Sequence, residues 1–390
     1  MLHRVVVAHN HYQMPGGEDR VFASEIAMLQ AHGHNVTRFE DHNDRIRVMH
    51  PVSTAAATIW NQRAFSRLQA LLAQVRPSLV HFHNTFPLIS PAAYHAARRQ
   101  GAAVVQTLHN YRLLCPAATF FREGAPCQQC VDSNSLLPSL QHGCYRQSRA
   151  ATGYVAAMLS FHRWLGSWIQ SVDVFIALSD FARQKFIEGG LPADRILVKH
   201  NFVASDPGMG DRDDGYALFV GRLTVEKGLN VLLDAWRQLH DVPLKIVGSG
   251  PLFGSVQLPN VHWLGQLDQS KTISVMQRAR ILIFPSIWFE AAPMVILEAF
   301  ATGLPVLASD LGAMRDIVSN GRNGLRFRAG DVAHLVESVR RVWNHSAELY
   351  NMRRNARLTY EQSYTPEINY PRLLDVYRAA MARAAGRSAV

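Results

Sequence analysis

The most constraining feature of this sequence is a repeated alternation of short apolar runs with longer stretches of helical periodicity. Each apolar run has the length of one strand and ends in Gly, His, Asn, Ser or Asp before the helical pattern begins. This order is typical of parallel βα units, in which helices cover the strands on both faces. The sequence therefore predicts an α/β fold built on parallel sheets.

The alternation occurs in two blocks, separated at residues 206–215 by a polar, glycine-rich stretch with the composition of a linker. We expect an N-terminal domain over residues 1–205, a second domain over 216–365, and a C-terminal helix over 366–390 that packs back on the first domain. The first block predicts strands over 2–8, 35–39, 79–82, 102–108, 174–178 and 196–199. The second block predicts strands over 216–220, 244–247, 261–264, 281–284, 306–308 and 325–327.

The composition excludes several classes of protein. With 48% hydrophobic and 18% charged residues, the 390-residue chain lacks the high charge of a disordered protein. No apolar run approaches the roughly 20 residues of a membrane span. The first residues show no apolar core of a signal peptide. We therefore expect a cytoplasmic protein.

The net charge of +10 is concentrated in one region. Between Arg45 and Val172 there are twelve arginines, no lysine and only two acidic residues, Glu123 and Asp132. The rest of the chain carries equal numbers of basic and acidic residues. A basic region of this kind attracts anions such as nucleic acid, phospholipid headgroups or a diphosphate substrate. A dispersed basic surface without a specific partner is the alternative.

Candidate site residues gather after the fourth strand of the second block, where Glu290 precedes a predicted helix that contains Glu298. Pro293 suits the first turn of that helix. The backbone N–H groups of Met294 and Val295 then point out of the positive helix end, which is a ready site for an anion. An anion site beside two carboxylates that accept hydrogen bonds from hydroxyl groups suits a phosphorylated sugar or a nucleotide. A helix with incidental acidic residues is the alternative.

Two further strand ends of this block are compatible with phosphate. Arg222 and Lys227 follow its first strand, and a guanidinium with an ammonium on one loop suits a diphosphate. Gly248 and Gly250 follow the second strand, where a ligand can approach the backbone closely. The third glycine of a dinucleotide fingerprint is missing, which argues against an NAD(P)-dependent enzyme.

In this order and spacing, the second-domain motifs resemble the retaining nucleotide-sugar glycosyltransferases of family 4, which have the GT-B fold. The motifs are Gly221-Arg222 with Lys227-Gly228, then Gly248-x-Gly250-Pro251, then Glu290-x7-Glu298. In the first domain the resemblance rests on Gly16-Gly17 and His109, and residues 109–116 are similar to a branch that builds bacterial surface polysaccharides. The chain departs from many members by carrying Ala291-Ala292 after the first glutamate.

The resemblance implies a fold of two Rossmann-like, doubly wound domains that face a central cleft. It also implies that Arg222 and Lys227 neutralise the departing pyrophosphate in place of a metal ion. Glu298 would bind the ribose, and Glu290 and His109 would contact the donor sugar. Further donor contacts would come from Gly16, Gly17, Gly248, Ala292, Met294 and Val295.

The sequence therefore predicts an enzyme that transfers a hexose from a nucleotide diphosphate sugar to a glycan or lipid-linked saccharide. No cofactor is expected for catalysis. The expected location is the inner face of the cell membrane, with the basic region against anionic lipid. A nucleic-acid-binding protein that uses this basic region is the second hypothesis, but Glu290 would repel phosphate and would stay unexplained.

All four cysteines lie within thirty residues, as Cys115, Cys127, Cys130 and Cys144. In a cytoplasmic protein a C-x2-C pair with two flanking cysteines predicts a structural zinc site before it predicts disulfides. Reactive thiols and an iron–sulfur cluster are the alternatives.

Two other sequence features are interpreted from their composition. Histidines 9, 11, 81, 83 and 109 fall at predicted strand ends, and we interpret them as hydrogen-bonding groups because no carboxylate completes a metal triad at similar spacing. The aromatic, acid-free run over 154–169 predicts a helix that lies either at a membrane interface or in the core.

Overall fold

The predicted strands form two parallel sheets in the computed structural model, which describes residues 4–14 and 16–387. The chain divides into two compact units. Unit 1 comprises Met1–Phe120, Gln128–His200 and Asn369–Val390, and unit 2 comprises Phe121–Cys127 and Asn201–Ile368. Among the described residues, none of the helices is both long and apolar enough to cross a membrane.

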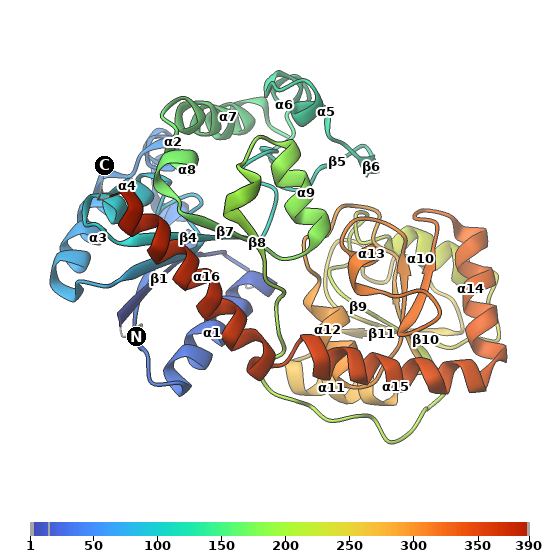
Figure 1. The fold of residues 1–390 in the computed structure, drawn as a ribbon. Helices are drawn as coiled ribbons and strands as arrows, with labels where there is room; N and C mark the ends of the chain where they lie inside the picture. Colours follow the sequence, from blue (N-terminus) through green and yellow to red (C-terminus); the bar gives the residue numbers. More distant parts are fainter. Residues whose placement is uncertain (1–3, 15, 388–390) are drawn as a thin grey trace. The chain divides into compact units, whose positions relative to one another are not determined.

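The sheet of unit 1 has six strands in the order β2-β1-β3-β4-β7-β8 (Figure 1). The chain passes from β2 on one side of β1 to β3 on the other, so the topological switch point, where ligands bind in open α/β sheets, lies between β1 and β3. Strands β3, β4 and β7 are buried along their whole length, as strands covered on both faces must be. The strands are β1 (Arg4–His11), β2 (Asn35–His42), β3 (Leu79–Asn84), β4 (Ala103–Leu108), β7 (Val174–Ala177) and β8 (Ile196–Val198).

Helices surround this sheet, and most of the last one, α16 (Pro366–Arg387), belongs to unit 1. Within unit 1, Tyr377 Oη of α16 lies 2.9 Å from His81 Nδ1 of β3, and Arg387 pairs with Asp173. The other helices are α1 (Gly17–Ala31), α2 (Pro51–Ile59), α3 (Gln62–Val75), α4 (Ala92–Arg99), α5 (Gln129–Asp132), α6 (Leu137–His142), α7 (Arg149–Trp164), α8 (Ser167–Ser171) and α9 (Asp180–Glu188), with the 3-10 helices η1 (Asn43–Val48) and η2 (Ala193–Arg195).

The sheet of unit 2 has the order β11-β10-β9-β12-β13-β14, which is the Rossmann order. Its switch point lies between β9 and β12. The strands are β9 (Ala217–Val220), β10 (Leu244–Val247), β11 (Val261–Gly265), β12 (Ile281–Phe284), β13 (Val306–Ser309) and β14 (Gly324–Phe327). The helices are α10 (Leu229–Trp236), α11 (Gln269–Arg278), α12 (Met294–Ala301), α13 (Met314–Ile317), α14 (Val332–Asn344) and α15 (Ser346–Ser363), and a short hairpin joins β5 (Phe121–Arg122) to β6 (Ala125–Pro126).

Unit 2 has a hydrophobic core on each face of its sheet. Along β12, Leu282 and Phe284 belong to one core, whereas Ile281 and Ile283 belong to the other. Successive side chains of a strand point to opposite faces, so a strand buried on both faces reads as a continuous apolar run. This is why β12 and its neighbours could be predicted from the sequence.

All the predicted strands are present, although Leu2 and His3 lie outside the described residues. The main difference is that three strands continue past their predicted ends: the edge strand β2 to His42, and the buried strands β1 and β3 to His11 and Asn84. Polar residues can extend these buried strands because they find partners there. Asn10 Oδ1, for example, accepts hydrogen bonds from the backbone N–H groups of Leu88 and Ile89.

The predicted helix over 154–169 is α7, which ends at Trp164, followed by the separate helix α8. One face of α7 is buried through Val155, Leu159 and His162, and in this respect it is a core helix. Its last residue, Trp164, is nevertheless 81% exposed.

Candidate active site

Two charged side chains meet at the switch point of unit 2. Lys227 lies in the loop after β9 and Glu290 in the loop after β12, and Lys227 Nζ lies 2.6 Å from Glu290 Oε1. Both side chains are largely buried, with 16% and 8% of their surfaces exposed. The structure thus brings together two of the residues that the sequence predicted as catalytic, although 63 positions separate them.

Glu290 Oε1 accepts two further hydrogen bonds, from Ser286 Oγ at 2.7 Å and from Trp288 Nε1 at 2.6 Å. The Trp288 ring also lies under the ammonium group of Lys227, whose Nζ is 5.2 Å from the ring centroid. Such a cation–π contact stabilises a partly desolvated lysine. Sequence reasoning missed Ser286 and Trp288. Their contacts with Glu290 depend on the path of the loop, which their spacing in the sequence does not reveal.

Glycine allows the loops after β9, β10 and β12 to approach one another. Gly228 has φ +73°, and a Cβ atom there would lie 1.8 Å from the carbonyl oxygen of Pro285. Gly248 has φ +143°, and its Cβ would lie 1.8 Å from the carbonyl oxygen of Gly221. Any other residue at Gly228 would push the Lys227 loop away from Glu290.

The N-terminus of α12 follows Glu290 directly. Pro293 is the N-cap residue and provides no side-chain cap for the N–H groups of the first turn, to which Met294 and Val295 belong. These amides carry the partial positive charge of the helix end and suit an anion. Glu298, one turn further along, is buried, and Ala292 lies in the loop just before the helix.

Arg222, the other predicted cation, is more exposed than Lys227. It lies at the end of β9 with 60% of its side chain exposed, and its guanidinium is 3.6 Å from Glu226. A weak, exposed ion pair of this kind contributes little stability, so Arg222 can exchange Glu226 for another anion at small cost.

The predicted site residues of unit 1 lie at the ends of β1 and β4. Gly16 is the N-cap of α1, and its backbone N–H donates to Asp19 Oδ2. Asp19 Oδ1 lies 2.8 Å from His9 Nε2, and burial lowers the pKa of His9 to about 4. This ring is therefore a neutral hydrogen-bonding group at physiological pH.

His109 follows β4 and is half-buried. Its Nε2 atom lies 2.9 Å from His83 Nδ1, and burial together with the neighbouring histidines lowers the pKa of His109 well below its ordinary value. The ring is therefore also neutral.

Next to His109, Asn110 Nδ2 lies 3.4 Å from both Tyr12 Oη and Glu18 Oε2. Burial raises the pKa of Glu18 to about 7. Sequence reasoning missed this polar group, because the loop after β1 and the loop after β4 are brought together only by the sheet.

Two groups of side chains in the described part of the chain gather as metal ligands do, and both correct the expectation that no carboxylate accompanies the histidines. They are His9 with His11 and Asp19, and Glu25 with His81 and His83. Helix α1 supplies the carboxylate in each. In the second group Lys199 Nζ lies 2.6 Å from Glu25 Oε1 and already supplies the positive charge that a metal ion would bring.

The cysteines are not among these groups. All four are half-buried, and none of the four forms a disulfide. The described geometry therefore contains no assembled four-thiolate site, and the zinc site stays a prediction.

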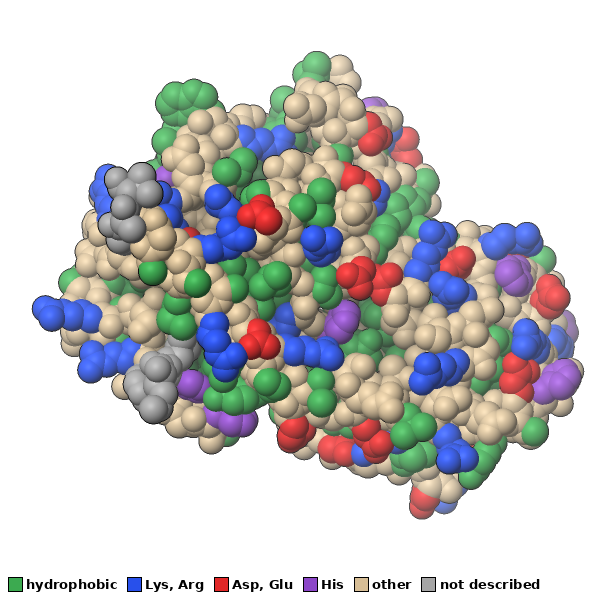
Figure 2. Space-filling view, viewed as in Figure 1, with side chains coloured by type: hydrophobic (Ala, Val, Ile, Leu, Met, Phe, Trp, Pro, Cys, Tyr) green, Lys and Arg blue, Asp and Glu red, His purple; other side chains and the backbone are tan. Residues whose placement is uncertain are grey.

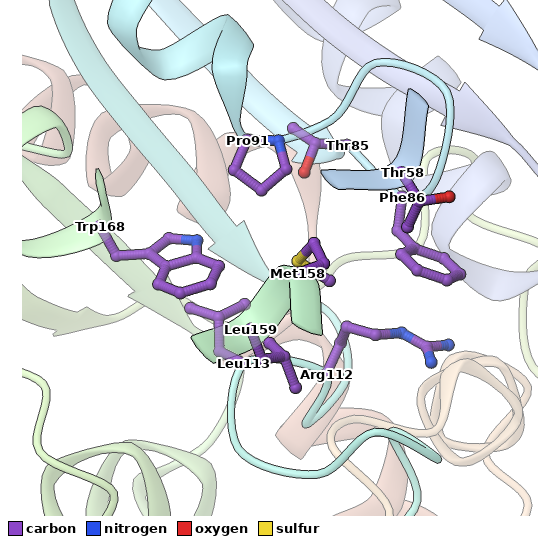
Figure 3. A pocket seen from close by; sticks show the side chains of 9 residues that line it. All are labelled: Thr58, Thr85, Phe86, Pro91, Arg112, Leu113, Met158, Leu159 and Trp168. Carbon is purple, nitrogen blue, oxygen red and sulfur yellow. The ribbon is translucent and has the colours of Figure 1, made fainter. Parts of the chain in front are cut away.

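Unit 1 also contains a small cavity of about 30 Å³, lined mainly by apolar side chains such as Met158, Leu159 and Trp168 (Figure 3). Arg112 is the charged residue of its lining, and its guanidinium lies over the ring of Phe86, 4.2 Å from the centroid. A cavity of this size has room for water but not for a sugar ring, and we assign it no role in substrate binding.

Comparison with known proteins decides the family. Residues 15–206 match the family described as "Glycosyltransferase Family 4", and residues 210–359 match the one described as "Glycosyl transferases group 1". The two matches follow each other along most of the chain. The chain belongs to the family 4 glycosyltransferases. The family predicted from the sequence motifs is thereby confirmed.

Curated relatives and solved structures agree with this assignment. The chain is 33% identical to a D-rhamnosyltransferase, WbpZ, of Pseudomonas aeruginosa, over 38% of this chain and 42% of that protein. It is 28% identical to O-antigen chain mannosyltransferase C of Escherichia coli, over 42% of this chain and 45% of that protein. The chain thus matches rather less than half the length of these glycosyltransferases.

A structure of Anabaena Alr3699/HepE in complex with UDP and glucose covers 97% of this chain and 100% of its own, with a TM-score of 0.65 and 16% identity. At this identity the likeness establishes the fold. The predicted GT-B fold, with its two Rossmann-like α/β domains, is confirmed.

Proposed function

We propose that this glycosyltransferase transfers a hexose from a nucleotide diphosphate sugar to a hydroxyl group of a saccharide acceptor, with retention of configuration and without a catalytic metal. The proposed acceptor is a glycan or lipid-linked saccharide of a bacterial surface polysaccharide. The names of the relatives support this, since one is a D-rhamnosyltransferase and the other an O-antigen chain mannosyltransferase. UDP bound to a protein of the same fold supports a nucleotide donor.

The observation that carries the proposal is the Lys227–Glu290 pair at the switch point of unit 2, beside the N-terminus of α12. Lys227, Arg222 and the amides of Met294 and Val295 offer positive charge to a diphosphate. Glu290 offers a hydrogen-bond acceptor to the hydroxyl groups of a sugar. A site for phosphate alone would gain nothing from a buried carboxylate, so the pair favours a ligand with both parts over a nucleic acid.

In the proposed reaction the bond between the anomeric carbon and the diphosphate oxygen breaks, and its electron pair leaves with the diphosphate. Lys227 and Arg222 stabilise the growing negative charge, the role that a divalent metal has in other transferases. The acceptor hydroxyl attacks the same face of the sugar and forms the new glycosidic bond. Its proton passes to the departing phosphate oxygen, so no separate enzymatic base is required.

The proposed location is the cytoplasmic face of the cell membrane. The surface of unit 1 supports this, since Arg63, Arg67, Arg98 and Arg99 of α3 and α4 are all exposed. Figure 2 shows basic side chains on the left side of the view, where α3 and α4 lie in Figure 1. Exposed apolar side chains accompany them in unit 1, with Trp164 81% and Val48 89% exposed. Basic and apolar groups together are what an anionic bilayer surface binds.

A structural zinc ion bound by Cys115, Cys127, Cys130 and Cys144 is part of the proposal, supported by the thiol chemistry and the C-x2-C pair alone. The sulfur atoms would have to converge on binding. Elemental analysis of untagged protein should find one zinc per chain, and Cys130→Ser should reduce it. Protein without zinc, whose four thiols react freely with a thiol reagent, would refute the site.

A panel of nucleotide sugars tests the proposed reaction directly. Hydrolysis of one donor without acceptor, in a chelating buffer, should release its nucleoside diphosphate. A nucleoside diphosphate should also bind in a titration, and Lys227→Ala should weaken that binding. Binding of DNA or of NAD(P) without binding of any nucleoside diphosphate would overturn the proposal in favour of the alternatives.

A further inference from the structure

Behind His109, unit 1 contains a buried chain of polar groups that the proposed reaction does not use. His109 Nε2 lies 2.9 Å from His83 Nδ1. His83 Nε2 lies 3.3 Å from Glu25 Oε2. Glu25 Oε1 accepts a hydrogen bond from Lys199 Nζ at 2.6 Å. The chain therefore runs from His109 to a buried lysine without a gap longer than 3.3 Å.

The contact between His83 and Glu25 determines which ring nitrogen of His83 carries the proton. Both residues are almost fully buried, and neither His83 Nε2 nor Glu25 Oε2 makes a hydrogen bond of ideal geometry. Glu25 Oε2 lies 3.3 Å from His83 Nε2 and 3.7 Å from His81 Nδ1. Buried polar atoms are nearly always paired. His81 Nδ1 already lies 2.9 Å from Tyr377 Oη, so the shorter contact, between His83 Nε2 and Glu25 Oε2, is the one that pairs these two atoms. A carboxylate oxygen can only accept, and His83 must therefore carry its proton on Nε2.

Charge balance supports a neutral ring at His83. Lys199 already neutralises Glu25, and Asn369 Oδ1 holds the same ammonium at 2.9 Å. A second cation at His83 would be a buried charge without a counter-ion, which is costly. The other rings around His83 offer no negative charge, because His9 and His81 are also neutral histidines with lowered pKa values.

We infer that Glu25, held by Lys199, acts through His83 as a positioning residue that fixes the tautomer of His109. With its proton on Nε2, neutral His83 has an accepting lone pair on Nδ1. His109 must then donate from Nε2, which leaves its Nδ1 without a proton. His109 is thus an acceptor, and on the proposed function it accepts a hydrogen bond from a hydroxyl group of the donor sugar.

The tautomer can be measured without any substrate. In protein labelled with ¹⁵N-histidine, long-range ¹H–¹⁵N correlation spectra distinguish protonated from unprotonated ring nitrogens, and the loss of one ring in His109→Gln assigns its signals. We expect a neutral His109 ring with its proton on Nε2. A proton on Nδ1, or a charged ring, in the wild-type enzyme would overturn the inference.

Three variants test the origin of the tautomer. In His83→Phe the acceptor is lost, and His109 should become a mixture of tautomers. In the double variant Glu25→Gln with Lys199→Met both buried charges are removed together, so neither is left unpaired, and the same mixture is expected. His162→Phe is the matched control, because His162 is equally buried in unit 1 but makes its hydrogen bonds with Ser167 and the carbonyl of Ile59 instead of with this chain of groups. It should leave the His109 signals unchanged, and a mixture there would point to general loosening of the unit.

Kinetics separate the inference from the proposed function. The kcat of donor hydrolysis should fall about tenfold in His83→Phe, about 1.4 kcal/mol of barrier, and His83→Gln, which returns an accepting oxygen, should recover part of it. An unchanged kcat in His83→Phe would overturn the positioning role. If the wild type shows the expected tautomer but hydrolyses no nucleotide sugar, the proposed function fails while the tautomer assignment stands.

Discussion

The two units have the same kind of parallel sheet but place their buried ion pairs differently. In unit 2 the pair of Lys227 and Glu290 lies on the loops at the switch point, where a ligand can reach it. In unit 1 the pair of Lys199 and Glu25 lies fully inside, and histidines stand between it and the strand ends. The charges of unit 2 can therefore act on a ligand directly, whereas those of unit 1 can act only through neutral imidazoles.

A second difference follows from the first. Burial lowers the pKa of several histidines in the described chain, among them His9, His81, His109 and His162, and all four belong to unit 1. Burying an imidazole favours its neutral form, so such residues make folding sensitive to acid. Unit 2 should not share this sensitivity.

The largest effect we predict is that acid unfolds unit 1 before unit 2. The pKa values of His9 and His162 are lowered to about 4, so between pH 6.5 and 4 the unfolded chain binds protons that the folded chain does not. The free energy of unfolding therefore decreases as the pH is lowered through this window, by roughly 3 kcal/mol for each histidine. Glu18 acts in the opposite direction, since its pKa is raised to about 7 and its contribution grows as pH falls. The net effect remains a loss.

Hydrogen exchange with mass spectrometry, corrected for the intrinsic effect of pH, checks this order. Peptides from β1 and β3 should lose protection at a higher pH than peptides from β9 and β12. The shifted carboxylates of unit 2, such as Asp206, have lowered pKa values and titrate only below the window. Loss of protection in both units at the same pH would show that the buried histidines do not distinguish them.

The second prediction concerns the ion pair of unit 2. Glu290→Gln and Lys227→Ala should each lower turnover by at least about tenfold, equal to roughly 1.4 kcal/mol of barrier, without unfolding the protein. Steady-state rates with the correct donor and acceptor measure this. Lys271→Ala is the matched control, because Lys271 pairs with Asp268 at an exposed site on α11 and forms no ion pair with Lys227 or Glu290 in the described part of the chain. Full activity in both site variants would show that the assigned roles are wrong.

A smaller effect is expected at Trp288. In Trp288→Phe the ring under Lys227 is kept, but the hydrogen bond from Nε1 to Glu290 Oε1 is lost. Ser286 and Lys227 still hold the carboxylate, so we expect a loss of about 1 kcal/mol, roughly fivefold in kcat. Trp288→Leu, which also removes the ring, should cost more. Equal rates for the two variants would leave the cation–π contact without a role.

Some of these features could be predicted from the sequence, and others could not. The strands were predictable because a strand buried on both faces must be a continuous apolar run, and the charged motifs were predictable because they follow such runs. Trp288 was not, because its contact depends on the course of a loop with no periodicity. Glu25 could have been found, since it shares the spacing of the buried residues Val21 and Leu29 on α1, where a charged residue needs a partner.

The two units also differ at the surface, since unit 1 carries the excess of positive charge and unit 2 is balanced. Each arginine near an anionic bilayer contributes on the order of 1 kcal/mol, and salt screens this attraction within a Debye length of about 10 Å at 0.1 M. The full chain should therefore bind anionic liposomes with a steep salt dependence and neutral ones weakly.

Arg63 with Arg67 and Arg98 with Arg99 are the pairs to reverse to glutamate. The reversals should weaken liposome binding and transfer to a lipid-linked acceptor, yet spare donor hydrolysis, whose charged residues lie in unit 2. The control reverses Arg237 and Arg328 of unit 2, which are 51% and 75% exposed. If the control weakened binding equally, net charge alone would account for the attraction, and the arginines of unit 1 would serve solubility.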